Sequence, residues 1–430
     1  MNMRVASMKS NIFSFDKLAI EGGQPVRNKP WPTYDKGNVI LNDEDAESLI
    51  EVMKSKRLFR YDNRRLEETK VGQFENELKK FFNTEYALAV SSGTAAISLP
   101  LMALGLPDNS LVGCPTYSFT ATPSAIIQAR LKPLLIEVDS NLHMDLADLE
   151  KKIQSMKALV VVHMRGFPAP LPQIKEIAAK YNVPIIEDAV PSLGSKLMGK
   201  FLGTYGVAGA FSTQSDKSLN TGEGGFILTN DKELYIKCVV LSGAYECLYE
   251  KHCTHRPEID VALLPIMNFR LDELHGALGL SQLKKLDGRL NILSRNYAYV
   301  LEGIEDLSYL KPRAPWHEAA CPIGDNLLLQ VNGSVDDCCW FADALSAEGV
   351  DTKALGSPHK INVRRFWDWA YLFPTKNKEE ITRLYQASFK HISSYIDIAL
   401  SPTLTPEDIT DFFNAIRKVH HYYENRKTFK

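Results

Sequence analysis

The sequence predicts an α/β protein, in which helices cover a mainly parallel β-sheet in a large domain and a smaller α+β domain follows. Two observations carry this prediction. Short apolar runs alternate with helical patterns from about residue 86 to 241, which is the rhythm of a parallel sheet with helices on both faces. A shorter set of strand and helix patterns follows beyond residue 290. A length of 430 residues is enough for two such units.

The chain is expected to divide into three segments, an amino-terminal arm (1–35), a large domain (36–288) and a small carboxyl-terminal domain (289–430). The arm contains Gly22-Gly23 and three prolines, which interrupt both helices and central strands. The first nine residues lack the apolar core of a signal peptide.

The expected elements of the large domain are short strands that each precede a helix. The strands are 86–91, 111–114, 133–138, 158–163 and 184–187, and the helices are 94–104, 119–129, 146–156 and 171–181. A further strand (225–229) and helix (232–241) come later, and residues 242–265 form an irregular stretch. The continuous apolar run at 158–163 predicts a strand buried on both faces.

A long helical pattern, residues 272–304, links the two domains and is interrupted near Asp287-Gly288. In the small domain we expect strands at 327–331 and 397–400 and helices at 337–345 and 406–420. The last helix carries Pro406 in its first turn, where proline is well tolerated.

Composition excludes several classes of protein. The formal charge of -2 does not indicate the basic surface that nucleic-acid binding requires. The sequence contains no apolar run of eighteen residues, so no membrane-spanning helix is predicted. The seven cysteines have no spacing typical of a metal site, so we expect reduced thiols in a cytoplasmic protein without a bound metal.

Lys217 and Asp188 form the most informative pair in the chain. Asp188 ends an apolar strand, and Lys217 lies in a polar turn that glycines 222, 224 and 225 close. Pyridoxal phosphate requires this combination, because a lysine forms a Schiff base with its aldehyde and a carboxylate keeps its pyridine nitrogen protonated. Lys217 would be both the covalent anchor and the proton-transfer base. The alternatives are a helix-capping aspartate and a solvated loop lysine.

The stretch from Ser91 to Ala95 joins a strand to a helix. Backbone N–H groups at a helix amino end bind anions, and Gly93 permits a close approach. Gly93 and Thr94 are therefore candidate ligands of the cofactor phosphate, with Ser212 as a further donor, although a simple helix cap explains the same residues. Phe119, at the start of the next helix, can stack on the cofactor ring or belong to the core.

Two further stretches carry polar side chains with open roles. His163 and Arg165 end an apolar strand at the same sheet edge, where His163 can position a substrate and Arg165 can hold an anionic group. A role in helix capping or a position on the surface would explain His163 and Arg165 equally well. Asn268 and Arg270 precede the long helix, where they can reach the site of a partner subunit.

Together these stretches resemble the DegT/DnrJ/EryC1/StrS family of sugar aminotransferases, which are fold-type I enzymes dependent on pyridoxal phosphate. The resemblance runs through most of the chain, with motifs at 92–96, 115–119, 187–189 and 268–274, and it is densest at Phe211-Ser212, Lys217 and 222–225. It implies phosphate contacts from Gly93, Thr94 and Ser212, and stacking by Phe119. It also implies a pyridine contact from Asp188 and the covalent bond from Lys217.

The family resemblance also implies a homodimer with shared active sites, in which Asn268 reaches the phosphate of the neighbouring subunit's cofactor. Arg60 and Tyr61 fall in a matching motif and join His163, Arg165 and Arg270 as candidate substrate contacts. One branch of the family replaces the lysine by histidine and performs dehydration, and Lys217 places this chain outside that branch.

One departure concerns substrate choice, because Pro191 stands where the family usually has a glutamine that contacts the cofactor or the substrate. Residues 355–375 resemble a specificity loop. The resulting hypothesis is transfer of an amino group from glutamate or glutamine to a keto group on a sugar, nucleotide-sugar or cyclitol, in antibiotic or surface-glycan biosynthesis. The alternatives are elimination, decarboxylation or rearrangement with the same cofactor, and a non-catalytic cofactor-binding regulator.

Overall fold

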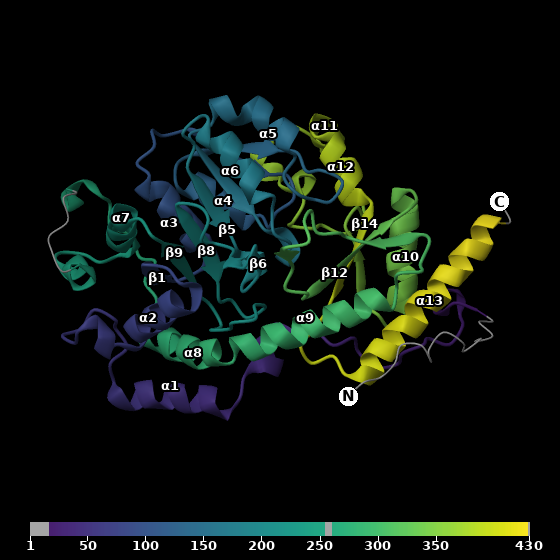
Figure 1. The fold of residues 1–430 in the computed structure, drawn as a ribbon, viewed down its shortest axis with the longest axis horizontal. Helices are drawn as coiled ribbons and strands as arrows, with labels where there is room; N and C mark the ends of the chain where they lie inside the picture. The colour runs from purple at the N-terminus through teal and green to yellow at the C-terminus, as the bar shows by residue number, and fades with distance from the viewer. Residues whose placement is uncertain (1–16, 254–259, 429–430) are drawn as a thin grey trace.

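The computed structural model describes residues 17–253 and 260–428. The first sixteen residues of the expected arm, including the segment examined for a signal peptide, lie outside the described residues. A seven-stranded sheet and a four-stranded sheet form two bodies, and helix α9 (Leu286–Glu302) runs from one to the other (Figure 1). The two-part α/β fold expected from the sequence is confirmed.

The large sheet has the order β1-β9-β8-β5-β4-β2-β3. Neighbouring strands from β8 to β3 are parallel, whereas β9 runs antiparallel to both β8 and β1. The strands are β1 (Tyr86–Val90), β2 (Leu111–Pro115), β3 (Lys132–Ile136), β4 (Ala158–Val162), β5 (Ile185–Asp188), β8 (Ala208–Ser212) and β9 (Gly225–Thr229). Strand β5 lies near the middle of the sheet, where Asp188 pairs with Val162 and with Ala210.

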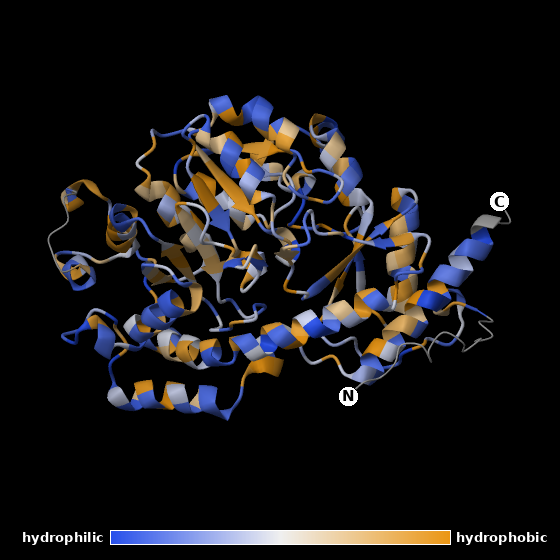
Figure 2. Cartoon of the chain, in the orientation of Figure 1, coloured by the Kyte–Doolittle hydropathy of each residue, from blue (hydrophilic) through white to orange (hydrophobic). Residues whose placement is uncertain are grey.

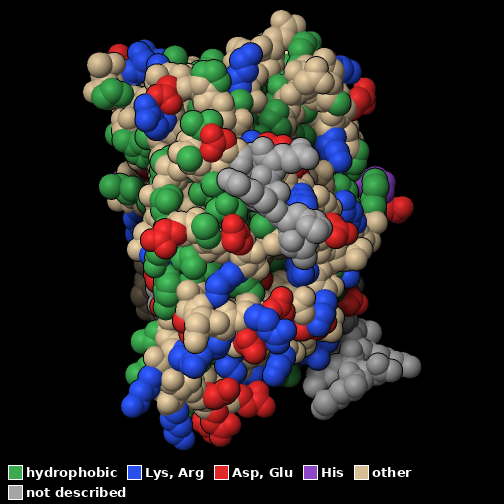
Figure 3. Space-filling view, turned by 90° about the vertical axis from the view of Figure 1, so that its left-hand side faces the viewer, with side chains coloured by type: hydrophobic (Ala, Val, Ile, Leu, Met, Phe, Trp, Pro, Cys, Tyr) green, Lys and Arg blue, Asp and Glu red, His purple; other side chains and the backbone are tan. Residues whose placement is uncertain are grey.

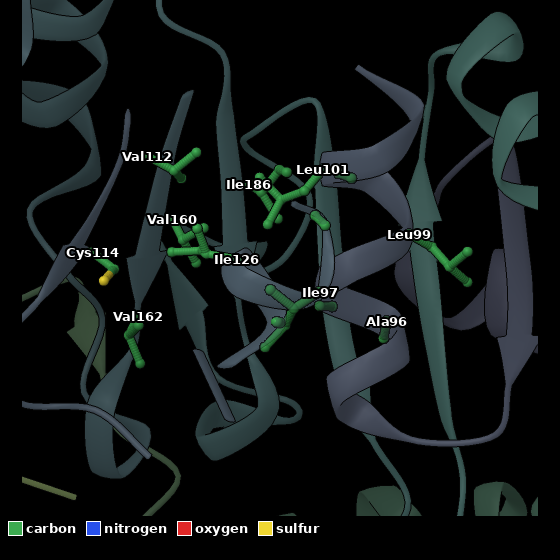
Figure 4. Close-up of a cluster of buried hydrophobic side chains, with 14 of the residues drawn as sticks. Ala96, Ile97, Leu99, Leu101, Val112, Cys114, Ile126, Val160, Val162 and Ile186 are labelled. Atoms are coloured by element: carbon green, nitrogen blue, oxygen red, sulfur yellow. The ribbon is translucent and has the colours of Figure 1, made fainter. Parts of the chain in front are cut away.

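Helices cover both faces of this sheet, as the alternation of side chains along β4 demonstrates. Val160 and Val162 belong to the core beneath helices α3 (Gly93–Ala103), α4 (Ala121–Gln128) and α7 (Lys232–Ser242). Leu159 and Val161 belong to the core beneath α5 (Leu146–Lys152) and α6 (Leu171–Ala179). Figure 4 shows side chains of α3 facing those of the strands, and Figure 2 shows the strands of the large sheet as largely hydrophobic.

Residues 36–85 contain two helices that the sequence analysis does not assign. Helix α1 (Asp43–Ser55) begins with a capping box at Asn42, and α2 (Lys70–Phe82) begins with a Thr69 cap. Both pack against α8 (Glu273–Lys284). The long pattern at 272–304 is two helices, α8 and α9, and the break falls at Lys285 rather than at Asp287-Gly288.

The small sheet has the order β10-β12-β14-β13 and is antiparallel. Its strands are β10 (Leu310–Pro312), β12 (Asn326–Val331), β13 (Thr352–Ala354) and β14 (Tyr395–Ala399). Helices α10 (Val335–Ala347) and α13 (Pro406–Thr428) share its core, whereas α11 (Lys378–Leu384) and α12 (Gln386–Ser393) pack on the core of the large sheet.

The described part of the arm packs on this small unit. Leu18 and Trp31 are buried in its core, and the Glu348 carboxylate accepts hydrogen bonds from the Ala19 and Val26 amides.

The excursion between Asp188 and Lys217 contains a hairpin of β6 (Lys196–Leu197) and β7 (Lys200–Phe201), joined at its edge by β11 (Ala320–Cys321). Strand β8 follows the hairpin and returns the chain to the centre of the large sheet. Among the described residues, no helix combines the length and the hydropathy needed to cross a membrane.

Candidate active site

Asp188 is the last residue of β5, at the carboxyl end of the parallel strands, where open sheets bind ligands. Its side chain is buried, and Oδ2 accepts a hydrogen bond of 2.6 Å from the Thr122 hydroxyl. Oδ1 accepts a weaker one of 3.2 Å from the Val190 amide. Burial raises the pKa of Asp188, and the neighbouring charges of His163 and Lys217 oppose that shift. A positively charged group beside this carboxylate would favour its ionised form.

Lys217 lies in the loop between β8 and β9. Backbone bonds between residues 213 and 224 and between 215 and 222 close the loop, and Gly222 and Gly224 take positive φ values that glycine adopts without strain. Burial lowers the pKa of Lys217, whereas the charges of Asp325 and Asp188 act in the opposite direction. A neutral amine is the form that attacks an aldehyde, so this environment favours covalent chemistry.

Asp188 and Lys217, which are 29 positions apart in the sequence, interact electrostatically in the fold. The reason is that β5 and β8 are parallel neighbours, so the loop after β8 begins at the same edge at which β5 ends. The tertiary structure therefore brings the two residues of the leading hypothesis together.

Gly93 and Ser212 meet at the amino end of α3. A Cβ atom on Gly93 would lie 2.7 Å from the Ser212 Cβ and 3.3 Å from the Val190 side chain, so only glycine fits. Ser92 caps the helix through a bond from the Ala95 amide to its hydroxyl. The cap leaves room for an anion site, because it uses one N–H and the amides of Gly93 and Thr94 also lie in this first turn.

Phe119 is not a core residue, since 43% of its surface is exposed. The Arg364 guanidinium lies over its ring, 5.9 Å from the centroid. Phe119 also precedes α4, which supplies the Thr122 hydroxyl to Asp188. An exposed aromatic face next to the buried carboxylate is the environment that a flat cofactor ring requires.

These residues fit pyridoxal phosphate on structural grounds. The structure combines a glycine cradle at a helix amino end, a buried carboxylate, an accessible aromatic face and a lysine with a lowered pKa. In the described part of the chain, no group of three or more His, Cys, Asp or Glu side chains has the arrangement of a metal site.

Three of the candidate substrate contacts are engaged elsewhere in the protein. Arg60 is buried and forms a bidentate ion pair with Glu75, at 2.8 and 2.9 Å. Tyr61 is buried and its hydroxyl bonds to His252 at 2.9 Å. His163 is buried, and its ring nitrogens bond to the Glu187 carboxylate and the Ala169 amide, both at 3.0 Å. All three side chains are thus buried and held by protein partners in this structure, and a role for them as substrate contacts stays a prediction.

Arg270 and Asn268 lie in the segment beside the amino end of α3, where the Ser91 amide donates to the Phe269 carbonyl. The Arg270 guanidinium donates to the Gly243 carbonyl and lies beside the stacked Phe59 and Tyr245 rings, 5.6 Å from each centroid. It therefore organises this segment. Asn268 is exposed on the surface of the chain.

Arg165 interacts electrostatically with Lys217, and so do two residues that were not assigned individually from the sequence. Both Arg165 and Arg364 lower the pKa of Lys217 through their charges, and Asp325 raises it. Arg364 opens the Arg-Arg-Phe-Trp-Asp-Trp stretch of the expected specificity loop. Asp325 precedes β12, and the polar pair Asp325-Asn326 before an apolar strand is the signal that marks it.

Sequence comparison links the chain to known proteins. It is 35% identical over 219 residues to GDP-perosamine synthase of Escherichia coli O157:H7, covering 50% of this chain and 58% of that protein. It is 29% identical over 303 residues to the L-glutamine:2-deoxy-scyllo-inosose aminotransferase of Streptomyces kanamyceticus, covering 69% of this chain and 70% of that enzyme. The first of these matches thus spans little more than half of the relative.

Comparison of folds agrees with this relationship. The E. coli GDP-4-keto-6-deoxy-D-mannose-3-dehydratase, solved with bound hydrated PLP, superposes with a TM-score of 0.72 at 20% identity, covering 90% of this chain and 99% of that one. The model of the DegT/DnrJ/EryC1/StrS aminotransferase family matches residues 39–417. With the family match spanning both sheets and every residue of the candidate site, the chain belongs to the DegT/DnrJ/EryC1/StrS aminotransferase family.

Proposed function

We propose that this protein is a pyridoxal-phosphate-dependent aminotransferase that moves an amino group from glutamate or glutamine to a keto group of a sugar, nucleotide-sugar or cyclitol. The observation that carries the proposal is the convergence of Lys217 and Asp188 at the carboxyl edge of the large sheet. The glutamine-dependent inosose aminotransferase and the perosamine synthase among the relatives support this donor and this acceptor class.

Each residue then has a defined task. Gly93, Thr94 and Ser212 would bind the phosphate, and Phe119 would support the ring. Lys217 would hold the cofactor covalently, and its Nζ, once released, would take a proton from the donor carbon and later return one. When bound, the cofactor supplies an electron sink for the carbanion. Asp188 would keep the proton on the pyridine nitrogen, and Thr122 orients its carboxylate.

Lys217 also separates this proposal from the main enzymatic alternative. A dehydratase is among the structural neighbours, and that branch of the family has histidine where this chain has lysine. Pro191 lies in a short 3-10 turn (Val190–Ser192) that packs against the Met164–Gly166 turn. Its ring can donate no hydrogen bond, so substrate contacts at this point must come from other side chains.

We further propose a cytoplasmic homodimer with shared sites, in which Asn268 reaches the cofactor of the neighbouring subunit, and a domain division at residues 35 and 288. Exposed apolar side chains flank the Asn268 segment, namely Leu58, Phe59, Tyr245, Leu263 and Ile266. Figure 3 views the end of the molecule near α7, where hydrophobic side chains gather at the surface. An apolar face of this kind is typical of a protein interface.

Substitution of the lysine tests the proposal. Lys217→Ala should lose the visible absorbance band of bound cofactor on dialysis and lose turnover, whereas Lys151→Ala, at an exposed position on α5, should keep both. Glutamate or glutamine offered alone to the wild-type enzyme should yield one oxo acid per site. A fully active Lys217→Ala enzyme contradicts the proposal, and release of an elimination product indicates the lyase alternative.

A further inference from the structure

The amino-terminal arm is fixed on the small domain just before it reaches the loop between β8 and β9. Trp31 is buried in the core of the small domain, and its indole N–H donates to the Ala399 carbonyl at the end of β14, at 2.8 Å. The Ser401 hydroxyl donates to the Thr33 carbonyl at 3.1 Å. The next residue of the arm, Tyr34, therefore follows an anchored stretch of backbone.

Tyr34 contacts the loop at the residue that follows Lys217. The hydroxyls of Tyr34 and Ser218 are 3.0 Å apart and share a hydrogen bond. Ser218 is buried, and its carbonyl accepts a bond of 2.6 Å from the Arg289 guanidinium of α9. The same guanidinium donates to the Ile40 carbonyl of the adjoining segment at 3.1 Å. Ser218 is thus held from outside the loop at two points, its hydroxyl and its carbonyl.

A glycine brings the same part of the chain close to the backbone of the loop. Gly37 lies in the short 3-10 helix η3 (Asp35–Ile40) with a φ of 87°, and its amide donates to the Tyr34 carbonyl at 2.7 Å. A Cβ atom on Gly37 would lie 2.7 Å from the Ser215 carbonyl oxygen and 1.8 Å from Asn220 Nδ2. Both this contact and the positive φ require glycine.

The backbone of Lys217 consequently has one anchor inside the loop and one outside it. Its amide donates to the Gln214 carbonyl at 2.9 Å, which fixes the chain before the lysine. The chain after the lysine is fixed through Ser218, by the bonds from Tyr34 and Arg289. Burial raises the pKa of Tyr34, so its hydroxyl stays uncharged and remains able to bond to Ser218.

We propose that Tyr34 is a positioning residue for Lys217, which acts through Ser218 to hold the lysine amine where it meets the cofactor aldehyde. The inference rests on the part of the proposed function in which Lys217 binds the cofactor. Removing the Tyr34 hydroxyl should slow formation of the covalent bond, in which the amine adds to the aldehyde and water leaves. It should not weaken noncovalent binding of the cofactor, because the bond that is lost is made to Ser218.

The test compares Tyr34→Phe, Ser218→Ala and the double variant with the wild type. The control is Tyr181→Phe, which removes the hydroxyl of an exposed tyrosine that is bonded to Gln154 at 3.2 Å. Cofactor-free protein is mixed with pyridoxal phosphate, and growth of the visible absorbance band is followed by stopped flow. A misplacement of about 1 Å can slow a reaction by about a hundredfold, so we expect growth at least about tenfold slower in both single variants. The control should match the wild type, and the double variant should be no slower than the single variants, because both remove the same bond.

Pyridoxamine phosphate, which has no aldehyde, reports on noncovalent binding alone. Its affinity, measured by calorimetry, and the melting temperature of the cofactor-free protein should stay close to wild type in Tyr34→Phe. Uptake of pyridoxal phosphate by Tyr34→Phe at the wild-type rate overturns the inference, and so does a loss of pyridoxamine phosphate affinity large enough to explain slower uptake. Uptake that depends on Tyr34 in a protein that consumes neither glutamate nor glutamine would leave the inference standing and refute the proposed amino transfer. A wild type that binds pyridoxamine phosphate but forms no visible band with pyridoxal phosphate refutes both.

Discussion

Replacing Asp188 by asparagine isolates the charge of the buried carboxylate. The two side chains have nearly the same shape, so the Val190 amide can still donate to Oδ1. The Thr122 hydroxyl can turn to accept from the new amide instead of donating at 2.6 Å. A typical hydrogen bond contributes about 1 kcal/mol net, so the exchange should change the stability of the fold by about that amount or less.

The effect on the rate should be much larger. Without its negative charge, residue 188 cannot keep a proton on the pyridine nitrogen of the bound cofactor. A charge pair at about 4 Å contributes about 4 kcal/mol at the effective dielectric constant of a protein, and about 1.4 kcal/mol corresponds to a factor of ten. We therefore expect Asp188→Asn to lower the rate of amino transfer by about a thousandfold, and by at least about tenfold.

Single-turnover measurements with glutamate, together with the melting temperature and the cofactor content, check this prediction. Asp231→Asn is a matched control, because Asp231 caps α7 through the Leu234 amide and asparagine caps equally well. The control should keep both rate and stability. If Asp188→Asn retains its cofactor and reacts within about tenfold of wild type, the assigned role of Asp188 is wrong.

Three further predictions follow from other parts of the structure. Gly93→Ala should weaken cofactor binding and cost about 1–3 kcal/mol of stability through the clash with Ser212. Gly288→Ala, with open space around it in α9, should instead stabilise the protein by about 1 kcal/mol. Cofactor loss on dialysis and the melting temperature distinguish the two variants. Burial and Arg313 hold the pKa of His143 well below 6.5, so below that pH the unfolded chain takes up a proton that the folded chain does not. As the pH is lowered below 6.5, the free energy of unfolding should therefore fall by at most about 1.4 kcal/mol per pH unit for this residue. His143→Leu should flatten the dependence of the melting temperature on pH. Mixing inactive Lys217→Ala and Asn268→Asp chains should restore activity if sites are shared, because one site of the mixed dimer carries neither change. If the subunits exchange but activity does not return, each site is built from a single chain.

The alternation of strands and helices could be predicted from the sequence because it depends on local patterns. Strand β4 is apolar at every position and is covered on both faces, and the predicted parallel arrangement follows from that burial. Strand β8, with the sequence Ala-Gly-Ala-Phe-Ser, has no such pattern. Its small residues fit between neighbouring strands and helices, so its position is set by packing rather than by propensity.

The chemical roles of single residues could also be predicted from the sequence. A lysine in a glycine-closed turn, an aspartate at a strand end and a glycine at a helix start each indicate one requirement of the cofactor, and their order matches the family. Which arginine faces the site was decided by the tertiary structure alone. Arg60, Arg165, Arg270, Arg364 and Arg365 carry the same group, but four of them have partners within the protein. Arg60 meets Glu75, Arg165 meets Asp397, Arg270 meets a carbonyl and Arg365 meets Asp368. Among the described residues, Arg364 has no such partner, because long-range packing determines where each acid and carbonyl lies.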